Sequence, residues 1–175
     1  MRQARHPGPS LEPRRLNVKA ASAGEYRLQL GEGEELHAGL LDALADLGLA
    51  HAAITLVSGR FAAFSYLTGQ PDKSGARLAT YGAPCLLAGP VTLIGANALV
   101  GSSVEGAPLL HCHAVVVDAE GRVHGGHLPP GACFVGAGGL VAQVLGLSGG
   151  GFAVAYDAET NYPIFHPKVI AEVSA

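Results

Sequence analysis

The 175-residue sequence has few charged side chains, few cysteines and no long apolar run. Charged residues make up only 14% of the chain and hydrophobic residues 49%, a balance that favours a surface partly covered by a partner subunit. No run of about 18 apolar residues occurs, so a membrane-spanning helix is not expected. The first twenty residues also lack the apolar stretch of a secretory signal.

Cysteine is scarce, and its spacing excludes two common uses. Cys85, Cys112 and Cys133 are an odd number and form no Cys-x-x-Cys motif. This spacing favours free thiols in a reducing compartment over a disulfide framework. The sequence therefore predicts a cytoplasmic protein.

Several nucleotide and hydrolase motifs are also missing. There is no P-loop and no Gly-x-Ser-x-Gly elbow. The segment FVGAGGLVAQVLG looks like a dinucleotide-binding loop, but Val141 stands where the fingerprint needs glycine or alanine, counting from Gly136. No acidic residue follows at the required distance, so this reading is rejected.

Charge is distributed unevenly along the chain. Residues 1–24 carry five basic residues against Glu12 alone, a net charge of +4, and they are rich in proline. The other residues have six basic and thirteen acidic side chains, a net charge of −7, which disfavours nucleic-acid binding by the folded part. We expect a flexible basic arm over residues 1–24, the only segment suited to DNA, and a single domain over residues 25–175.

One helix is predicted, and it follows a short alternating strand at residues 26–30. Residues 35–47 place Leu36, Leu40, Leu44 and Leu47 near a helical period. Glu34 and Glu35 at the start suit the positive end of the helix dipole, and Gly48 suits a left-handed C-terminal cap.

The remainder of the chain has the pattern of β-strands. Strand-like runs with Gly-containing turns between them occupy residues 52–59, 60–68, 77–81, 90–100, 108–118, 121–128, 132–146 and 151–157. Short strands joined by such turns favour a largely antiparallel sheet. The predicted fold is α/β in the α+β sense: mostly antiparallel β-sheet with one main α-helix.

Histidines in the run HCHAVVV carry the clearest chemical signal. His111 and His113 are two residues apart, so on a strand both side chains face the same side and can approach one ion, while Cys112 faces the core. Residues 118–121 form a natural hairpin turn that returns His127 to the same neighbourhood. Three imidazoles with an open position are typical of a catalytic or ligand-binding zinc site.

The flanking residues refine this prediction. Gly125 and Gly126 remove side-chain bulk beside the expected ion and would permit a bulge that aims His127 inward. His124 is expected to be a second layer or surface residue. Three further histidines, His37, His51 and His166, are expected to face solvent or to be hydrogen-bonded core residues.

The ordered segments GEGEEL, ITLVSG, GPVTLIGANA, PLLHCHAVVVDAEGRVHGGHL and VAYDAETNYPIF resemble the plants-and-prokaryotes-conserved (PPC) domain over residues 25–165. The chain is similar to the prokaryotic members that stand alone, since the Arg-Gly-Arg-Pro AT-hook of plant members is absent. The resemblance implies an antiparallel sheet with one main helix, a homotrimer, and metal binding by His111, His113 and His127. The fold of the family also resembles that of acetolactate decarboxylase.

One departure from the family concerns an acidic residue. Members often carry Glu-Ile-Leu-Ser-Leu-Ser-Gly where this chain has Pro90-Val-Thr-Leu-Ile-Gly-Ala96, so the role of that glutamate does not transfer.

Three functions are compatible with these features. The first is a trimeric protein that uses zinc, iron, nickel or manganese to bind or transform a small carboxylate or keto metabolite, with Arg60 or Arg122 orienting the anion and Glu105 as a candidate acid or base. The second is a trimeric scaffold without catalysis. The third, which the family name suggests, is DNA binding through the basic arm.

Overall fold

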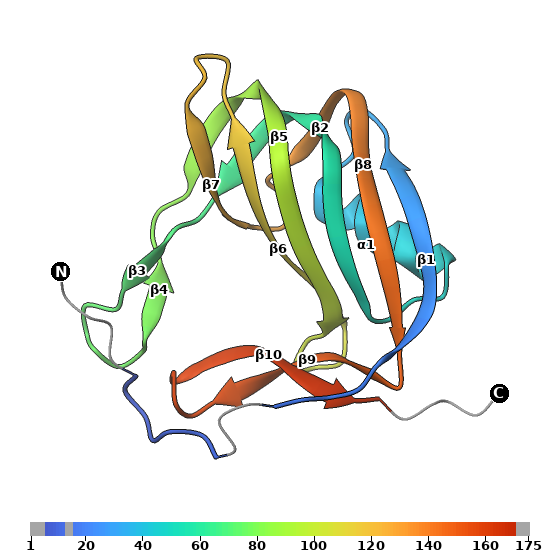
Figure 1. The fold of residues 1–175 in the computed structure, drawn as a ribbon. Coiled ribbons are helices and arrows are strands. Elements are labelled where there is room, and N and C mark those ends of the chain that lie inside the picture. Colours follow the sequence, from blue (N-terminus) through green and yellow to red (C-terminus); the bar gives the residue numbers. More distant parts are fainter. Residues whose placement is uncertain (1–5, 13–15, 171–175) are drawn as a thin grey trace.

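The computed structural model describes residues 6–12 and 16–170, so Arg2, Arg5, Arg14 and Arg15 of the predicted arm lie outside the described residues. Figure 1 shows a large curved sheet with one helix behind it and a hairpin at its lower end. The elements are β1 (Ala21–Leu30), α1 (Leu36–Asp46), β2 (Ala52–Tyr66), β3 (Gly69–Pro71), β4 (Ala79–Tyr81), β5 (Cys85–Ser102), β6 (Pro108–Val117), β7 (Val123–Leu128), β8 (Phe134–Ser148), β9 (Gly150–Asp157) and β10 (Tyr162–Val169).

The main sheet has the order β1-β8-β2-β5-β6-β7, and each neighbouring pair is antiparallel. The β9–β10 hairpin joins this sheet through one parallel pair, Ser102 with Ala153. Within the described residues α1 is the only α-helix. The predicted fold class, mostly antiparallel sheet with one main helix, is therefore confirmed.

The strands differ from the prediction in several places. The two runs at 52–59 and 60–68 form one long strand, β2, whose register shifts near Ser58 and Phe61. β5 begins five residues before the predicted start, and neither β3 nor β10 was predicted. β1 begins at Ala21, inside the predicted arm, because residues 21 and 22 already pair with β8.

The helix ends follow the predicted chemistry. Glu35 is the N-cap, and its carboxylate accepts a hydrogen bond from the Ala38 N–H at 2.8 Å. At the other end Gly48 has a φ of 68°, and the N–H of Leu49 donates to the Leu44 carbonyl, which is the bonding of a Schellman motif. Leu47 departs from the prediction, since it is the C-cap and is exposed, whereas His37 is buried.

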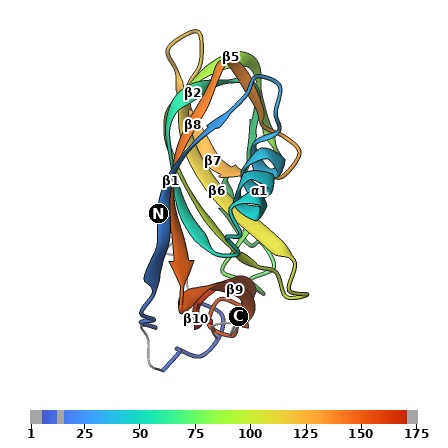
Figure 2. The same ribbon diagram turned by 90° about the vertical axis from the view of Figure 1, so that its right-hand side faces the viewer.

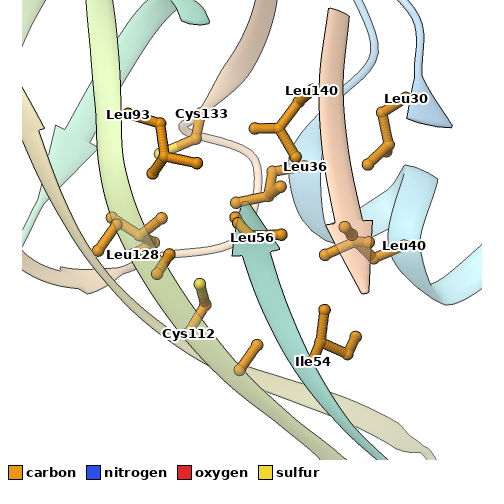
Figure 3. Packing of buried hydrophobic residues seen from close by; sticks show 14 of the residues in the cluster. Leu30, Leu36, Leu40, Ile54, Leu56, Leu93, Cys112, Leu128, Cys133 and Leu140 are labelled. Carbon is orange, nitrogen blue, oxygen red and sulfur yellow. The ribbon is translucent and has the colours of Figure 1, made fainter. Parts of the chain in front are cut away.

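The hydrophobic core lies between α1 and one face of the sheet (Figure 2). Figure 3 shows Leu36 and Leu40 of the helix beside Ile54 and Leu56 of β2 and Leu140 of β8. All five are essentially inaccessible to water. Because each fully buried leucine or isoleucine contributes roughly 1.5–3 kcal/mol, this layer holds α1 against the sheet on which the site is built.

The residue that follows β2 contacts β7, which is the edge strand of the main sheet. Just past Tyr66, Leu67 and His127 of β7 form a bridge in which each backbone N–H donates to the other's carbonyl, at 2.8 and 2.9 Å. The backbone of His127 is therefore held on both sides, by β6 and by Leu67.

Candidate metal centre

The alternation of β6 divides its side chains as the sequence predicts. Cys112 has no exposed surface and packs in the core, whereas His111 and His113 lie on the opposite, outer face. Burial raises the pKa of the Cys112 thiol to about 12, with a smaller contribution from Cys133. Cys112 is therefore a neutral core residue and does not belong to the histidine cluster.

The predicted hairpin brings His127 back to this face. Its turn is closed by hydrogen bonds from the Asp118 N–H to the Arg122 carbonyl and from the Gly121 N–H to the Asp118 carbonyl. Gly121 has a φ of 80°, which glycine adopts without strain. The register of β6 and β7 then places His127 directly opposite His113.

The three imidazoles converge on one point. One ligand nitrogen from each of His111, His113 and His127 lies within 4.8 Å of the others. The Nε2 atoms of His111 and His113 are 3.0 Å apart, and the ring centres of His111 and His127 are separated by 4.6 Å. The predicted convergence of the rings is confirmed, and their role as metal ligands stays a prediction.

The surroundings keep these rings uncharged. Burial is the main cause that lowers the pKa of His127 to about 4, and the nearby His111 and His113 contribute to the same shift. Burial is also the main cause that lowers the pKa of His111 and of His113. All three are therefore neutral near pH 7, the form in which an imidazole nitrogen has a lone pair for a metal.

A divalent ion fits this set of residues. The Nδ1 atom of His127 is buried without a hydrogen-bond partner, a costly arrangement for a polar atom. The cluster supplies three neutral nitrogen donors and no carboxylate or thiol. Three imidazoles are a donor set that zinc and related transition metals accept, and they leave the positive charge of the ion uncompensated.

Two aromatic side chains next to the cluster were not predicted as part of it. Tyr81 of β4 stacks on the His127 ring with 4.8 Å between ring centres, and Phe165 of β10 meets the His111 ring edge-on at 6.2 Å. Both come from segments that are distant in sequence. The β-favouring residues Tyr162, Ile164 and Phe165, which follow Asn161 with its φ of 52°, were the local signal for β10.

The glycine pair before His127 has a different role from the predicted one. The pairing of β7 with β6 is regular from Cys112 to Val117, so the expected bulge is absent there. A Cβ atom on Gly125 would lie 2.4 Å from the Ala114 carbonyl oxygen, and one on Gly126 would lie 2.3 Å from that of Leu67. The glycines therefore permit the close packing of backbones that positions His127.

The other candidate residues lie away from the cluster. His124 bonds to Asp118 through Nε2 at 2.9 Å and to the Tyr66 hydroxyl through Nδ1 at 3.3 Å. Arg122 pairs with Asp118 and Glu120 at the hairpin turn. Arg60 is exposed on β2, and Glu105 bonds to Ser103 in an exposed loop. None of the three proposed acid–base or anion-binding side chains lines the pocket beside His111 and His127.

The remaining histidines are partly as expected. His51 accepts a hydrogen bond from the Phe152 N–H at 3.4 Å. His37 is buried, with Nδ1 3.6 Å from a Glu35 oxygen, and burial lowers its pKa although Glu35 opposes the shift. The Nε2 atom of His166 is buried without a hydrogen-bond partner, so this ring is neither solvent-facing nor bonded there.

A row of polar side chains crosses the outer face of the sheet at the level of the cluster. Successive cross-strand partners are Arg27, Gln143, Thr55, Asn97, His113 and His127. Exposed apolar side chains, including Val115 and Leu145, lie on the same face. The cluster is thus the end of a polar row within a largely apolar surface.

This fold and site define a small β-sheet protein with a histidine cluster suited to metal binding. The profile of the Plants and Prokaryotes Conserved (PCC) domain matches residues 19–146, and the chain belongs to this family. A search of curated proteins finds no significant match.

Solved structures of similar fold come from archaea and bacteria. A metal-containing protein from Archaeoglobus fulgidus is 22% identical, with a TM-score of 0.70 over 87% of this chain and 99% of that one. A PPC protein from Pyrococcus horikoshii is 21% identical, with a TM-score of 0.67 over 92% and 100% of the chains. A protein from Ralstonia eutropha described as a "Putative DNA-binding protein" is 20% identical, with a TM-score of 0.64 over 81% and 90%.

Proposed function

We propose that His111, His113 and His127 hold one divalent transition-metal ion, with zinc as the best match, and that this site binds a small carboxylate or keto metabolite. The observation that carries the proposal is the convergence of three imidazole nitrogens without any acidic side chain among them. The description of the Archaeoglobus fulgidus protein as metal-containing supports it.

The chain's own residues have separable roles in this proposal. The hairpin register and the Leu67 bridge position the His127 ring, and the alternation of β6 positions the other two. When bound, the ion would supply a Lewis acid that polarises a carbonyl group and attracts an anionic oxygen. No residue in the cluster is a carboxylic acid or thiol, so the acid–base residue of any reaction is not assigned.

Binding can be tested with cobalt(II), whose visible absorption reports its ligands. The full chain is loaded with cobalt(II) and titrated with 2-keto and 2-hydroxy acids. We expect a change in the cobalt spectrum that saturates with added acid, because the acid oxygen enters the open coordination position. A spectrum that no acid changes would contradict the metabolite part of the proposal.

We also propose that the protein is a homotrimer that uses the outer face of the sheet. Support comes from exposed apolar side chains on that face, such as Leu145, which is 37% exposed, and Val115, which is 42% exposed. The alternative to metabolite binding is a trimeric scaffold without chemistry. Replacing His111 and His127 together distinguishes these two functions, because a variant that loses the trimer without losing any ligand binding favours the scaffold.

DNA binding is a second candidate, supported by the basic arm and by the description of the Ralstonia eutropha protein. The net charge of −7 outside the arm opposes it. The test is to delete residues 1–15, which leaves β1 intact, and to measure retention on DNA at several salt concentrations. Equal retention with and without the arm would exclude DNA binding through the arm.

No helix in the described part of the chain is long and apolar enough to cross a membrane.

A further inference from the structure

A pocket of about 610 Å³ opens beside the histidine cluster. Its walls come from the outer face of β6, from β4 and from β10, and both His111 and His127 line it. Pockets of roughly 300–1,000 Å³ are the size that binds metabolites and cofactors. The cluster therefore borders a half-open pocket and not only bulk water.

The lining of this pocket is apolar and uncharged. Leu78, Leu109, Val154 and Ile164 contribute aliphatic surface, and Tyr81 and Phe165 contribute rings. Among the described residues that line it, none is Asp, Glu, Lys or Arg. Arg77 does not line the pocket, and its guanidinium group lies over the ring of Tyr162, 5.4 Å from the ring centre.

This charge distribution limits what the pocket can hold. A divalent ion at three neutral histidines would keep its charge of +2, and no described residue that lines the pocket adds another positive charge. A carboxylate next to the ion would therefore be neutralised, whereas a carboxylate at the far end of the pocket would leave water without a partner, which is unfavourable. An apolar group, in contrast, gains by burial against the leucines and rings.

We infer that the ligand of this site is a monocarboxylate with an apolar body, aromatic or branched, whose body lies between β4 and β10. The inference rests on the metal-binding function proposed above and narrows its ligand class. It excludes ligands whose second negative charge would lie away from the ion, such as extended dicarboxylates, because no described cation lines that part of the pocket.

The test compares three acids on the full chain loaded with cobalt(II): 3-phenylpropanoate, succinate and acetate. We expect 3-phenylpropanoate to bind more tightly than the other two by at least tenfold, on the order of what burial of an aromatic ring supplies. The variant Ile164→Glu places a carboxylate in the pocket and should abolish this preference while the cobalt spectrum is kept. The matched control is Val169→Glu, on the same strand, 71% exposed and outside the pocket.

The outcomes separate the two proposals. Equal affinities for the three acids, or a preference that Ile164→Glu leaves unchanged, would overturn the ligand class and leave metal binding intact. A chain that takes up no cobalt(II) would overturn the proposed function itself. A cobalt-loaded chain that responds to no acid would overturn both the inference and the metabolite part of the proposed function, and would leave metal binding intact.

Discussion

Asp118 shows how one side chain organises the hairpin that carries His127. Its carboxylate accepts hydrogen bonds from the Arg122 side chain at 2.7 Å and from the backbone N–H groups of Glu120 and Arg122. Burial alone would raise the pKa of Asp118, but hydrogen bonds from His124 and Arg122 and the Arg122 charge outweigh it and hold the pKa well below its usual value. The ionised carboxylate therefore stabilises the folded state.

We predict that Asp118→Asn lowers the melting temperature at neutral pH. Because the folded-state pKa is depressed, the contribution is present above the unfolded pKa of about 3.9 and is lost as the pH falls through the folded value. Thermal unfolding followed by circular dichroism should thus show a difference at pH 7 and pH 5 that shrinks toward pH 2. Glu120→Gln is the control, since the Glu120 side chain is 64% exposed and contacts only Arg122 in this network, and the substitution keeps the backbone N–H that donates to Asp118. An Asp118→Asn difference that does not depend on pH would contradict this assignment.

At the scale of the elements, the junction of β2 with β7 places His127. Gly126 allows the Leu67 carbonyl to approach the backbone of β7, since a Cβ atom there would be 2.3 Å from that oxygen. We predict that Gly126→Ala destabilises the protein by about 1–3 kcal/mol through overpacking and weakens metal binding. Denaturant unfolding and a metal titration measure the two effects.

Gly95→Ala in β5 is the matched control for this substitution. A Cβ atom on Gly95 meets nothing within 4 Å, so the same chemical change should have little effect on either measurement. A Gly126→Ala variant as stable as Gly95→Ala would show that the Leu67 bridge does not position the site.

The local part of the site could be predicted from the sequence, and the long-range part could not. The spacing of His111 and His113, the inward Cys112 and the turn at residues 118–121 all follow from strand alternation and turn chemistry within 17 residues. Tyr81, Phe165 and the Leu67 bridge come from segments about 40 or more residues away from the rings or backbone they contact. No periodicity specifies such contacts, because they depend on how the long β2 bends and where the β9–β10 hairpin folds back.

The same limit applies to the ends of the folded part. The prediction assigned residues 21–24 to an arm because they have no alternation, yet β1 begins at Ala21. Pairing with β8, at Ala21 with Ser148 and Ser22 with Leu147, sets this boundary. The likeness to acetolactate decarboxylase stays a prediction.

At the scale of the whole molecule, we propose that the outer face of the sheet forms the trimer interface. We predict that Leu145→Glu weakens the proposed trimer strongly, because a carboxylate buried in that interface would lose its water without gaining a partner. Sedimentation equilibrium should show a shift from trimer to monomer. Val169→Glu, on β10, should leave the assembly unchanged, and a wild-type chain that sediments as a monomer would contradict the proposal.

The metal content of the purified protein tests the central claim most directly. Elemental analysis of protein prepared without added metal, followed by titration with zinc, should give one ion per chain. The same analysis of His127→Ala should give a large loss of bound zinc with the fold retained, because two imidazoles on one strand cannot complete the site. A wild-type chain without metal that does not take up zinc, or a His127→Ala variant that binds zinc as tightly as wild type, would contradict the account.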